Sequence, residues 1–403
     1  MKLIQSLLAS QVGFSVVFSL ALIGIIMLVV VYCIYWERKI SAWIQDRYGP
    51  NRVGPFGLLQ PFADGLKFFM KEEWIPPWSD KGLFVAAPVL MFTLSLIGFA
   101  IVPWAGELHW PWMPPGQTVS TLVAGVDIGI LYFLAVGGLS VYAIVLGAWA
   151  SKSKFPFYGG IRATAQVLSY EVPLGLGLFV IVLGAGSIRL DDILGYQTRM
   201  WQVGTVPVWP AWNFFLHPVT FLLVLITAFA ETNRLPFDLS EAEQELVGGY
   251  HTEYSALKFG GFYLAEYANM ITISAILVVM FWGGWHLPGV SDSPHIGWMV
   301  LRLVIVWAKI IVFLFFYMWV RWTLLRFRYD QLMRLAWATL VPLGLLLLAW
   351  TALLTLIGRQ ATWLAPAGEI AIFVLMAAVG AVRSQPITGR QRDLPAGRVV
   401  QLE

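Results

Sequence analysis

Six charged side chains fall inside long apolar stretches of the sequence, where a lipid environment makes charge costly. A charged group at the middle of a bilayer costs at least about 2.5–3.5 kcal/mol on insertion scales. Such groups serve proton or ion transfer, form structural ion pairs or reach toward the surface. We favour the transfer role for Glu171 and Glu266, and Pro173 predicts a helix defect beside Glu171. The six residues are Asp127, Glu171, Glu266, Arg302, Lys309 and Glu369.

A second candidate site is the acidic segment ETNRLPFDLSEAEQELVGGYHTEY, which begins at Glu231 and in which Arg234 is the only Lys or Arg. Ser240 with Glu243 makes a capping box, which predicts a short helix with several carboxylates on one face. Repulsion among like charges favours their protonated form, as holding and passing protons near neutral pH requires. A solvated acidic helix that docks a basic partner is the alternative. The acids are Glu231, Asp238, Glu241, Glu243, Glu245 and Glu253.

The first long polar segment, residues 36–81, mixes Gly and Pro turns with charged side chains. Its basic residues could simply set the topology, but Glu37 and Asp64 beside apolar faces are not explained in that way. The segment RWTLLRFRYDQLM, which begins at Arg321, leaves the same two roles open for its charged residues: setting the topology, or a function. Within residues 56–69 the apolar positions recur every three or four residues, which predicts an amphipathic helix in the membrane interface. This stripe consists of Leu59, Phe62, Leu66 and Phe69.

Only a membrane helix bundle can position these groups, because 59% of the 403 residues are hydrophobic and 12% are charged. An ordinary soluble domain has roughly a quarter of its residues charged. Apolar stretches of the length that crosses a bilayer recur along the chain. We predict an all-α polytopic transmembrane bundle of eight to nine spans, forming a single membrane domain over residues 1–403. The candidate spans are 12–35, 82–104, 125–149, 163–186, 214–230, 259–285, 298–320, 337–357 and 366–382, the last interrupted by Glu369.

Basic residues are concentrated on one side of these spans. With alternating spans, five segments share one side and hold 19 of the 26 Lys and Arg residues. The positive-inside rule places that side in the cytoplasm and the N-terminus outside. The five are the first cytoplasmic loop with its amphipathic helix (36–81), residues 150–163, the acidic cytoplasmic loop (231–257), residues 321–336 and the basic cytoplasmic tail (383–403).

Several cofactor motifs are missing from the sequence: a Walker A motif, GxGxxG after a strand, CxxC, and a pair of axial-ligand histidines. The chain itself should therefore bind no nucleotide, flavin, haem, iron–sulfur cluster or metal. Cys33 is the single cysteine and is assigned to packing, and His251 is interpreted as a loop histidine. The net charge of +3 does not indicate nucleic-acid binding in so apolar a chain.

Four sequence blocks closely resemble the membrane-arm, quinone-site subunit of respiratory complex I, called the H subunit of bacterial NADH:quinone oxidoreductase. They are ERKISAWIQDRYGPNRVGPFGLLQPFADG, WASKSKFPFYGGIRATAQVLSYE, ETNRLPFDLSEAEQELVGGYHTEYSALKFGGFYLAEY and RFRYDQLM. With the intervening spans, the resemblance covers roughly residues 10 to 345. It implies a protein of the bacterial cytoplasmic (inner) membrane.

The resemblance implies that the chain walls the tunnel through which ubiquinone or menaquinone enters, and that its acids couple quinone reduction to proton translocation. FMN and iron–sulfur clusters are then expected only in partner subunits, namely the peripheral-arm quinone-site and Fe–S subunits, and the antiporter-like membrane subunits are further partners. By position, the implied quinone-site residues are Glu37, Arg38, Arg47, Asp64, Arg234, Arg321 and Arg326. The implied catalytic residues are Glu171, Glu231, Glu253, Glu266, Asp238, Glu241, Glu243 and Lys309.

Two other functions are compatible with intramembrane charges. A free-standing ion or solute transporter often has inverted repeats and helices broken in matching positions, and no repeat is found in this sequence. A docking scaffold that joins a redox arm to membrane pumps would tolerate neutralised acids as long as the assembly formed. Co-purification with flavin- and cluster-bearing subunits would separate the leading interpretation from a transporter.

Overall fold

The structure is a computed structural model that describes residues 10–114, 116–198, 200–203, 206–239, 247–358 and 362–383. It is built from long helices joined by short helical turns and two small antiparallel hairpins. The helices are α2 (Gln11–Ile44), α3 (Gln60–Met70), α4 (Lys81–Ile97), α5 (Gly129–Ala150), α6 (Lys154–Ala185), α7 (Leu190–Gln197), α8 (Asn213–Leu216), α9 (Pro218–Glu231), α11 (Ala256–Phe281), α12 (Ile296–Thr323), α13 (Tyr329–Arg334), α14 (Val341–Ile357) and α15 (Leu364–Arg383). The hairpins pair β1 (Glu107–Leu108) with β2 (Val119–Ser120) and β3 (Met200–Val203) with β4 (Val206–Pro210).

The prediction of an all-α polytopic bundle is confirmed. Seven helical stretches in the described part of the chain are long and apolar enough to cross a membrane: α2, α5, α6, α11 and α12, α4 with the turn that follows it (Lys81–Ile101), and the continuous stretch from α13 through α14 (Tyr329–Ile357). Two shorter apolar helices, Pro218–Glu231 and Leu364–Gly380, coincide with the remaining predicted spans. At 1.5 Å per residue, the 14 residues of α9 extend only about 21 Å, less than the roughly 30 Å of a hydrocarbon core.

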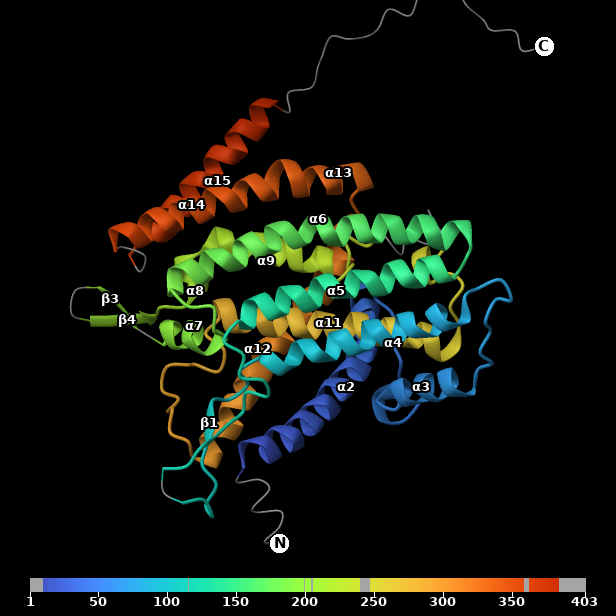
Figure 1. The fold of residues 1–403 in the computed structure, drawn as a ribbon, viewed down its shortest axis with the longest axis horizontal. Helices are drawn as coiled ribbons and strands as arrows, with labels where there is room; N and C mark the ends of the chain where they lie inside the picture. The colour runs from blue at the N-terminus through green and yellow to red at the C-terminus, as the bar shows by residue number, and fades with distance from the viewer. Residues whose placement is uncertain are drawn as a thin grey trace, which may run out of the picture.

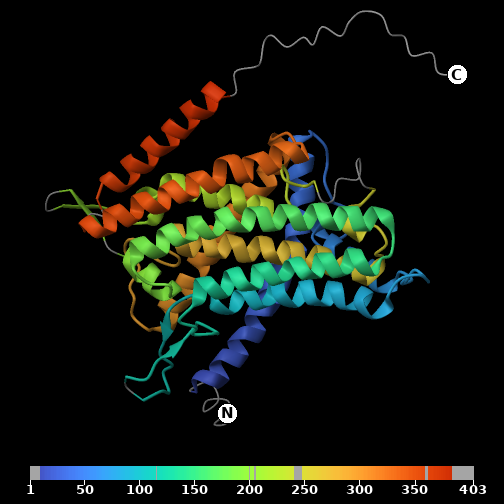
Figure 2. The same ribbon diagram turned by 45° about the horizontal axis from the view of Figure 1, so that its top comes forward.

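Helix α11 forms the centre of the bundle and is the most deeply buried of the seven long spans. It packs against α4, α12, α2 and α9. Helices α4, α5 and α6 run side by side, α2 crosses the bundle at a steep angle, and α14 and α15 lie outermost (Figures 1 and 2). Helix α15 diverges from the others toward its C-terminal end (Figure 2).

Proline and glycine residues occur at special positions in the long helices: a proline lies inside α6, and glycines end α6 and α14. Helix α6 continues through Pro173, so the predicted defect next to Glu171 is confined to the hydrogen bond that proline cannot donate. Helices α6 and α14 end where Gly186 and Gly358 adopt left-handed φ values of +74° and +71°. Glycine adopts this conformation at the C-terminus of a helix without the penalty that a Cβ atom brings.

The amphipathic helix predicted within residues 56–69 is present as α3, preceded by the short turn Pro55–Gly57. The apolar stripe of Leu59, Phe62, Leu66 and Phe69 is exposed, with Phe69 at 74%. Asp64, on the other side of the helix, is half-buried and turns toward α2. An exposed apolar stripe beside a membrane bundle is the arrangement that a helix lying in the interface needs.

Sidedness can be tested by cysteine labelling in a Cys33→Ala background, because Lys154 and Thr118 are exposed at opposite ends of the bundle. We expect a membrane-impermeant maleimide to reach Lys154→Cys in inside-out vesicles and Thr118→Cys in right-side-out vesicles, since the basic loops face the cytoplasm under the positive-inside rule. Labelling of Thr118→Cys from the cytoplasmic side would mean that the topology is inverted.

Candidate functional site

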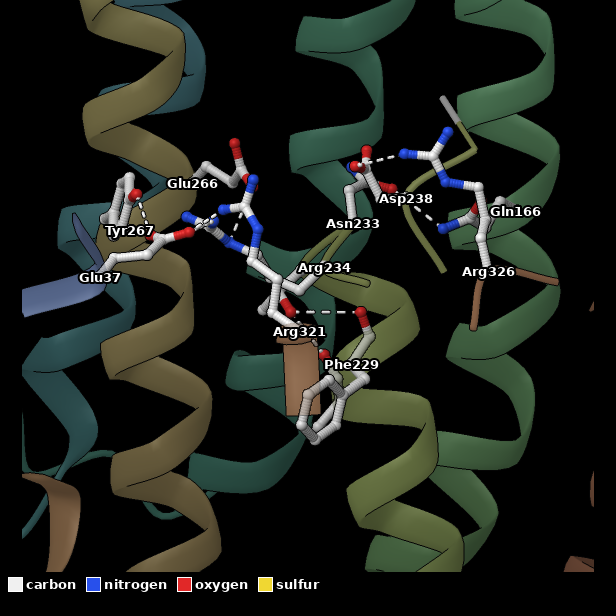
Figure 3. A network of polar contacts seen from close by, with 12 residues as sticks. Glu37, Gln166, Phe229, Asn233, Arg234, Asp238, Glu266, Tyr267, Arg321 and Arg326 are labelled. Atoms are coloured by element: carbon white, nitrogen blue, oxygen red, sulfur yellow. Dashed lines mark hydrogen bonds and ion pairs between the residues drawn. The ribbon is translucent and has the colours of Figure 1, made fainter. Parts of the chain in front are cut away.

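Arg234 forms the centre of a buried charge network that joins three elements. It lies in the loop that follows α9 and is 7% exposed. Its Nη1 atom is 3.5 Å from Oε1 of Glu37 on α2, and its Nε atom is 3.1 Å from Oε1 of Glu266 on α11. Both carboxylates are buried, so Arg234 compensates two negative charges that would otherwise be very costly inside the protein. Figure 3 shows this arrangement.

Glu37 has two further partners in the network. Arg321, near the C-terminus of α12, forms an ion pair with Oε1 of Glu37, and the hydroxyl of Tyr267 on α11 donates a hydrogen bond to Oε2 (Figure 3). The guanidinium of Arg234 also lies 4.2 Å from the centre of the Tyr267 ring, a favourable cation–π distance. One carboxylate therefore ties together α2, α11, α12 and the loop after α9.

A second part of that loop is fixed by hydrogen bonds and an ion pair. The Nε2 atom of Gln166, on α6, contacts the Ala230 carbonyl at 3.0 Å, Oδ1 of Asn233 at 3.1 Å and the Phe237 carbonyl at 2.8 Å. Asp238 pairs with Arg326 at 3.3 Å (Figure 3). The loop is therefore held against α6 on one side and against the segment after α12 on the other.

Glu171 and Glu231 face two consecutive glycines of α5. A β-carbon built on Gly138 would lie 2.9 Å from Oε1 of Glu171, and one built on Gly137 would lie 3.1 Å from Oε1 of Glu231. Side chains at these positions would crowd the carboxylates, so the glycines make room for them. The structure thus brings together two acids that are 60 residues apart in the sequence.

A small cavity adjoins Glu231. Its volume is about 20 Å³, and its lining includes Gly137, Ser140, Asn269 and Thr272. The Oε2 atom of Glu231 is buried and has no hydrogen-bond partner among the described residues. A cavity of this size with several polar groups meets the requirements for one bound water molecule.

Of the residues predicted at the quinone entrance, Arg38 and Asp64 contact each other and Arg47 does not contact either of them in the described part of the chain. Arg38, near the end of α2, forms a 2.6 Å ion pair with Asp64 of α3, and Gln60 donates to the other oxygen of Asp64 at 3.1 Å. Arg47 lies beyond the end of α2, is exposed and contacts Gln45. The described contacts therefore join Arg38, and not Arg47, to Asp64.

Lys309 and Arg302 bind main-chain carbonyl groups, and no ion pair with an acid is found for either in the described part of the chain. The ammonium of Lys309 donates to the carbonyls of Trp282, Gly284 and His286 at 2.6, 2.7 and 3.1 Å, where α11 ends. Arg302 binds the carbonyls of Ala105, Ser291 and Ser293. A cation at the C-terminal end of a helix satisfies carbonyls that lack intrahelical partners.

Two of the six intramembrane charges have surroundings that the sequence did not indicate. Asp127 precedes α5, and its side chain is 82% exposed and paired with Arg189 at 3.0 Å. The expected span starting at residue 125 is thus four residues too long at its start, because α5 begins at Gly129 and the apolar pattern continues into the loop before it. Glu369, in contrast, is fully buried within α15.

The remaining predicted acids are less closely connected to this network. Glu253 is half-buried, and no hydrogen bond or ion pair in the described residues joins it to Glu231 or Glu266. Glu241 and Glu243, with their predicted capping box, lie outside the described residues. His251 is buried against Tyr250 and Phe259, and burial lowers the pKa of its imidazole to about 4, so it stays neutral near pH 7.

Three contributors to the site were missed in the sequence. Tyr267 directly follows Glu266, yet only the crossing of α2 and α11 brings its hydroxyl to Glu37. Gln166 and the Gly137–Gly138 pair have ordinary local sequence, and their roles depend on which helix packs opposite them. The glycine pair, adjacent and inside an apolar helix, was the one available signal of a close approach.

The chain matches one protein family over most of its length. The family model described as NADH dehydrogenase matches residues 17–352. The chain is 45% identical over 336 residues to the NADH-quinone oxidoreductase H subunit of Flavobacterium psychrophilum, covering 81% of this chain and 92% of that relative. The H subunits from Thermomicrobium roseum and Rhodospirillum rubrum are each 44% identical, covering 84% and 80% of this chain and 94% and 88% of those relatives.

The charge network predicts a large penalty for removing Arg234. We expect Arg234→Met to destabilise the folded protein by about 3–5 kcal/mol, because it leaves Glu37 and Glu266 buried beside each other without their shared cation. Thermal inactivation of the membrane-bound enzyme would measure the loss. The control is Arg328→Met, since the Arg328–Asp330 pair is exposed and such pairs contribute about 0–1 kcal/mol. Equal effects of both substitutions would contradict the assignment.

Proposed function

This chain belongs to the NADH dehydrogenase family as an H subunit of NADH-quinone oxidoreductase, and we propose that it forms the quinone access path and couples quinone reduction to proton translocation. The enzyme is a multi-subunit oxidoreductase, and this chain is a polytopic membrane subunit of it. We propose as partners the peripheral-arm quinone-site and Fe–S subunits and the antiporter-like membrane subunits. FMN and the clusters would reside in those partners.

Quinone reduction sets the chemical requirement. A quinone that accepts two electrons takes up two protons to become a quinol, and both protons must come from groups near the bound headgroup. We assign the electron donor to a partner subunit and the protonic part of the reaction to this chain. Carboxylates that share basic partners are suited to this role, because loss or gain of a proton at one changes the field at the next.

The access path would begin at α3 and α2. The exposed apolar stripe of α3 can border the isoprenoid tail, while the Arg38–Asp64 pair fixes α3 to α2. Glu37 follows on the inner face of α2, one position before Arg38, and leads from this pair to the Arg234 network. Arg47, Arg321 and Arg326 would contribute positive charge around the polar end of the path.

The proton path would continue from the Arg234 network into the membrane. Glu266 connects directly to Arg234, and the loop from Arg234 leads back to Glu231 at the end of α9. The polar cavity beside Glu231 and the adjacent glycines extend this path toward Glu171. Glu253, Asp238, Glu241 and Glu243 remain proposed members on the loop side, whereas the carbonyl contacts of Lys309 favour a structural role.

One observation carries this proposal: a single buried arginine holds the carboxylates of two crossing helices, and the same loop leads back to Glu231, whose buried Oε2 atom lacks a hydrogen-bond partner among the described residues. Structural ion pairs alone do not account for Glu231. Its oxygen beside a water-sized polar cavity has the surroundings of a group that exchanges a proton.

The entrance can be tested at Asp64. We expect Asp64→Asn to raise the apparent KM for short-tailed quinones severalfold, because losing the ion pair with Arg38 lets α3 shift relative to α2. The NADH–ferricyanide activity, which does not use the quinone path, should be unchanged. Asp46→Asn, at an exposed position beyond α2, is the matched control. Equal loss of both activities in Asp64→Asn would indicate misassembly and not a damaged entrance.

The proton path can be tested at Glu171 and Glu266. We expect Glu171→Gln and Glu266→Gln to leave the complex assembled while lowering quinone reductase turnover at least about tenfold, a barrier change of about 1.4 kcal/mol. Glutamine keeps the shape of the side chain but cannot carry a proton. Proton translocation, measured in vesicles, should fall in proportion to turnover, because quinone reduction stalls when its proton supply is cut.

The exposed Glu107→Gln is the matched control and should retain wild-type rates. An assembled Glu171→Gln/Glu266→Gln double variant with wild-type turnover and proton yield would remove both residues from the path. That result would favour the docking-scaffold function instead.

A further inference from the structure

The N-terminus of α9 is capped by a carboxylate from the far end of the chain. Helix α9 begins at Pro218, directly after α8, and no side chain of its own N-terminal residues caps it. The missing cap is supplied by Glu369 of α15, which is 0% exposed. The two elements are about 150 residues apart in the sequence and in direct contact in the fold.

Every main-chain N–H at this helix start has a partner. Pro218 has no N–H, and the N–H groups of Val219 and Thr220 donate to Oε2 of Glu369 at 3.0 and 3.1 Å. The next N–H, that of Phe221, makes the first intrahelical bond, to the His217 carbonyl. Glu369 therefore satisfies both N–H groups that the helix itself leaves unpaired.

The other carboxylate oxygen is equally well bound. Oε1 of Glu369 accepts from the Thr220 hydroxyl at 2.8 Å and lies 2.7 Å from Nδ1 of His217. A negative charge at the N-terminus of a helix is also favoured by the helix dipole. His217, Thr220 and Glu369 are all buried, so a lost cap would leave main-chain N–H groups unpaired inside the protein.

The opposite end of α9 carries the residues of the proposed proton path. Glu231 is its last residue, and the loop with Asn233, Arg234 and Asp238 follows at once. Between the two ends, α9 lies tightly on α6, since Gly177 leaves no room for a side chain against Leu223 and Val224. A helix packed in this way transmits a shift at its start to Glu231 at its end.

We propose that Glu369 is a positioning residue for the coupling reaction: through α9 it holds Glu231 against Gly137 and beside the polar cavity. This inference rests on the proposed role of Glu231 in the proton path. Helix α15 lies beyond residue 352, where the match to the family ends, so this role is not carried over from the family. Through Glu369, the C-terminal helix α15 fixes the start of α9 and so the position of Glu231.

Substitutions in the complete membrane enzyme test this proposal. We expect Glu369→Ala to lower quinone reductase turnover at least about tenfold, with the quinone KM within about twofold of wild type. Glu369→Gln should retain at least about half of the wild-type turnover, because an amide oxygen can still accept from the Val219 and Thr220 N–H groups. Glu369→Ala with unchanged turnover, or Glu369→Gln as impaired as Glu369→Ala, would overturn the positioning role.

A second-site substitution keeps the test decisive if Glu369→Ala fails to assemble. Aspartate is a preferred N-cap residue, so Glu369→Ala/His217→Asp supplies the cap from the N-cap position itself, directly before α9. We expect this double variant to assemble and to recover most of the lost turnover. Failure of the double variant to assemble or to recover turnover would count against the proposal, because capping of α9 would then not be the property that matters.

Glu231→Gln, measured in parallel, separates this inference from the proposed function. Wild-type turnover and proton yield in Glu231→Gln would remove Glu231 from the proton path, and the inference would fall with it. Low turnover in Glu231→Gln together with wild-type turnover in Glu369→Ala would leave the proposed function standing and overturn only the positioning role of Glu369.

Discussion

The structure depends on how Arg234 and Glu37 compensate each other's charge inside a bundle whose solvent is lipid. Neither charge would be tolerated there without counter-charges, because an uncompensated buried charge costs several kcal/mol. Glu37 on α2, Glu266 on α11 and Arg321 on α12 therefore have to meet at one place. Their pairing fixes where the steeply inclined α2 crosses the bundle and how the loop after α9 is folded.

The same requirement applies to two helix ends at the opposite end of the bundle. Helix α11 stops where three carbonyls converge on Lys309, and α9 starts where two N–H groups converge on Glu369. In lipid, a helix can start or stop at depth only if such main-chain groups find partners within the protein. Each buried charge has the sign that complements the helix end it binds, cationic for carbonyls and anionic for N–H groups.

The helix bundle, the positions of its seven long and two shorter apolar helices and the amphipathic α3 were predictable from the sequence, because each depends on a local pattern that the chain carries on its own. The buried charges could also be singled out, since charge in an apolar run is conspicuous. The interaction partner of each charge could not be predicted. Lys309 was grouped with the acids but binds carbonyls, and Asp127 was placed in a span but lies exposed beside Arg189, because partners come from helices distant in sequence.

The buried charges are of two kinds, which differ in whether their partners are main-chain groups or charged and polar side chains. Lys309 and the Oε2 atom of Glu369 bind main-chain groups that cannot change their charge, so removing either side chain leaves its helix end unsatisfied. Glu37 instead shares its oxygens among Arg234, Arg321 and Tyr267, all of which are side chains. A proton added to Glu37 would weaken its hold on both arginines at once, while Arg234 would still have Glu266 as a counter-ion. The Arg234 network can therefore redistribute charge without losing the fold, provided that the helix ends stay fixed at the other side of the bundle.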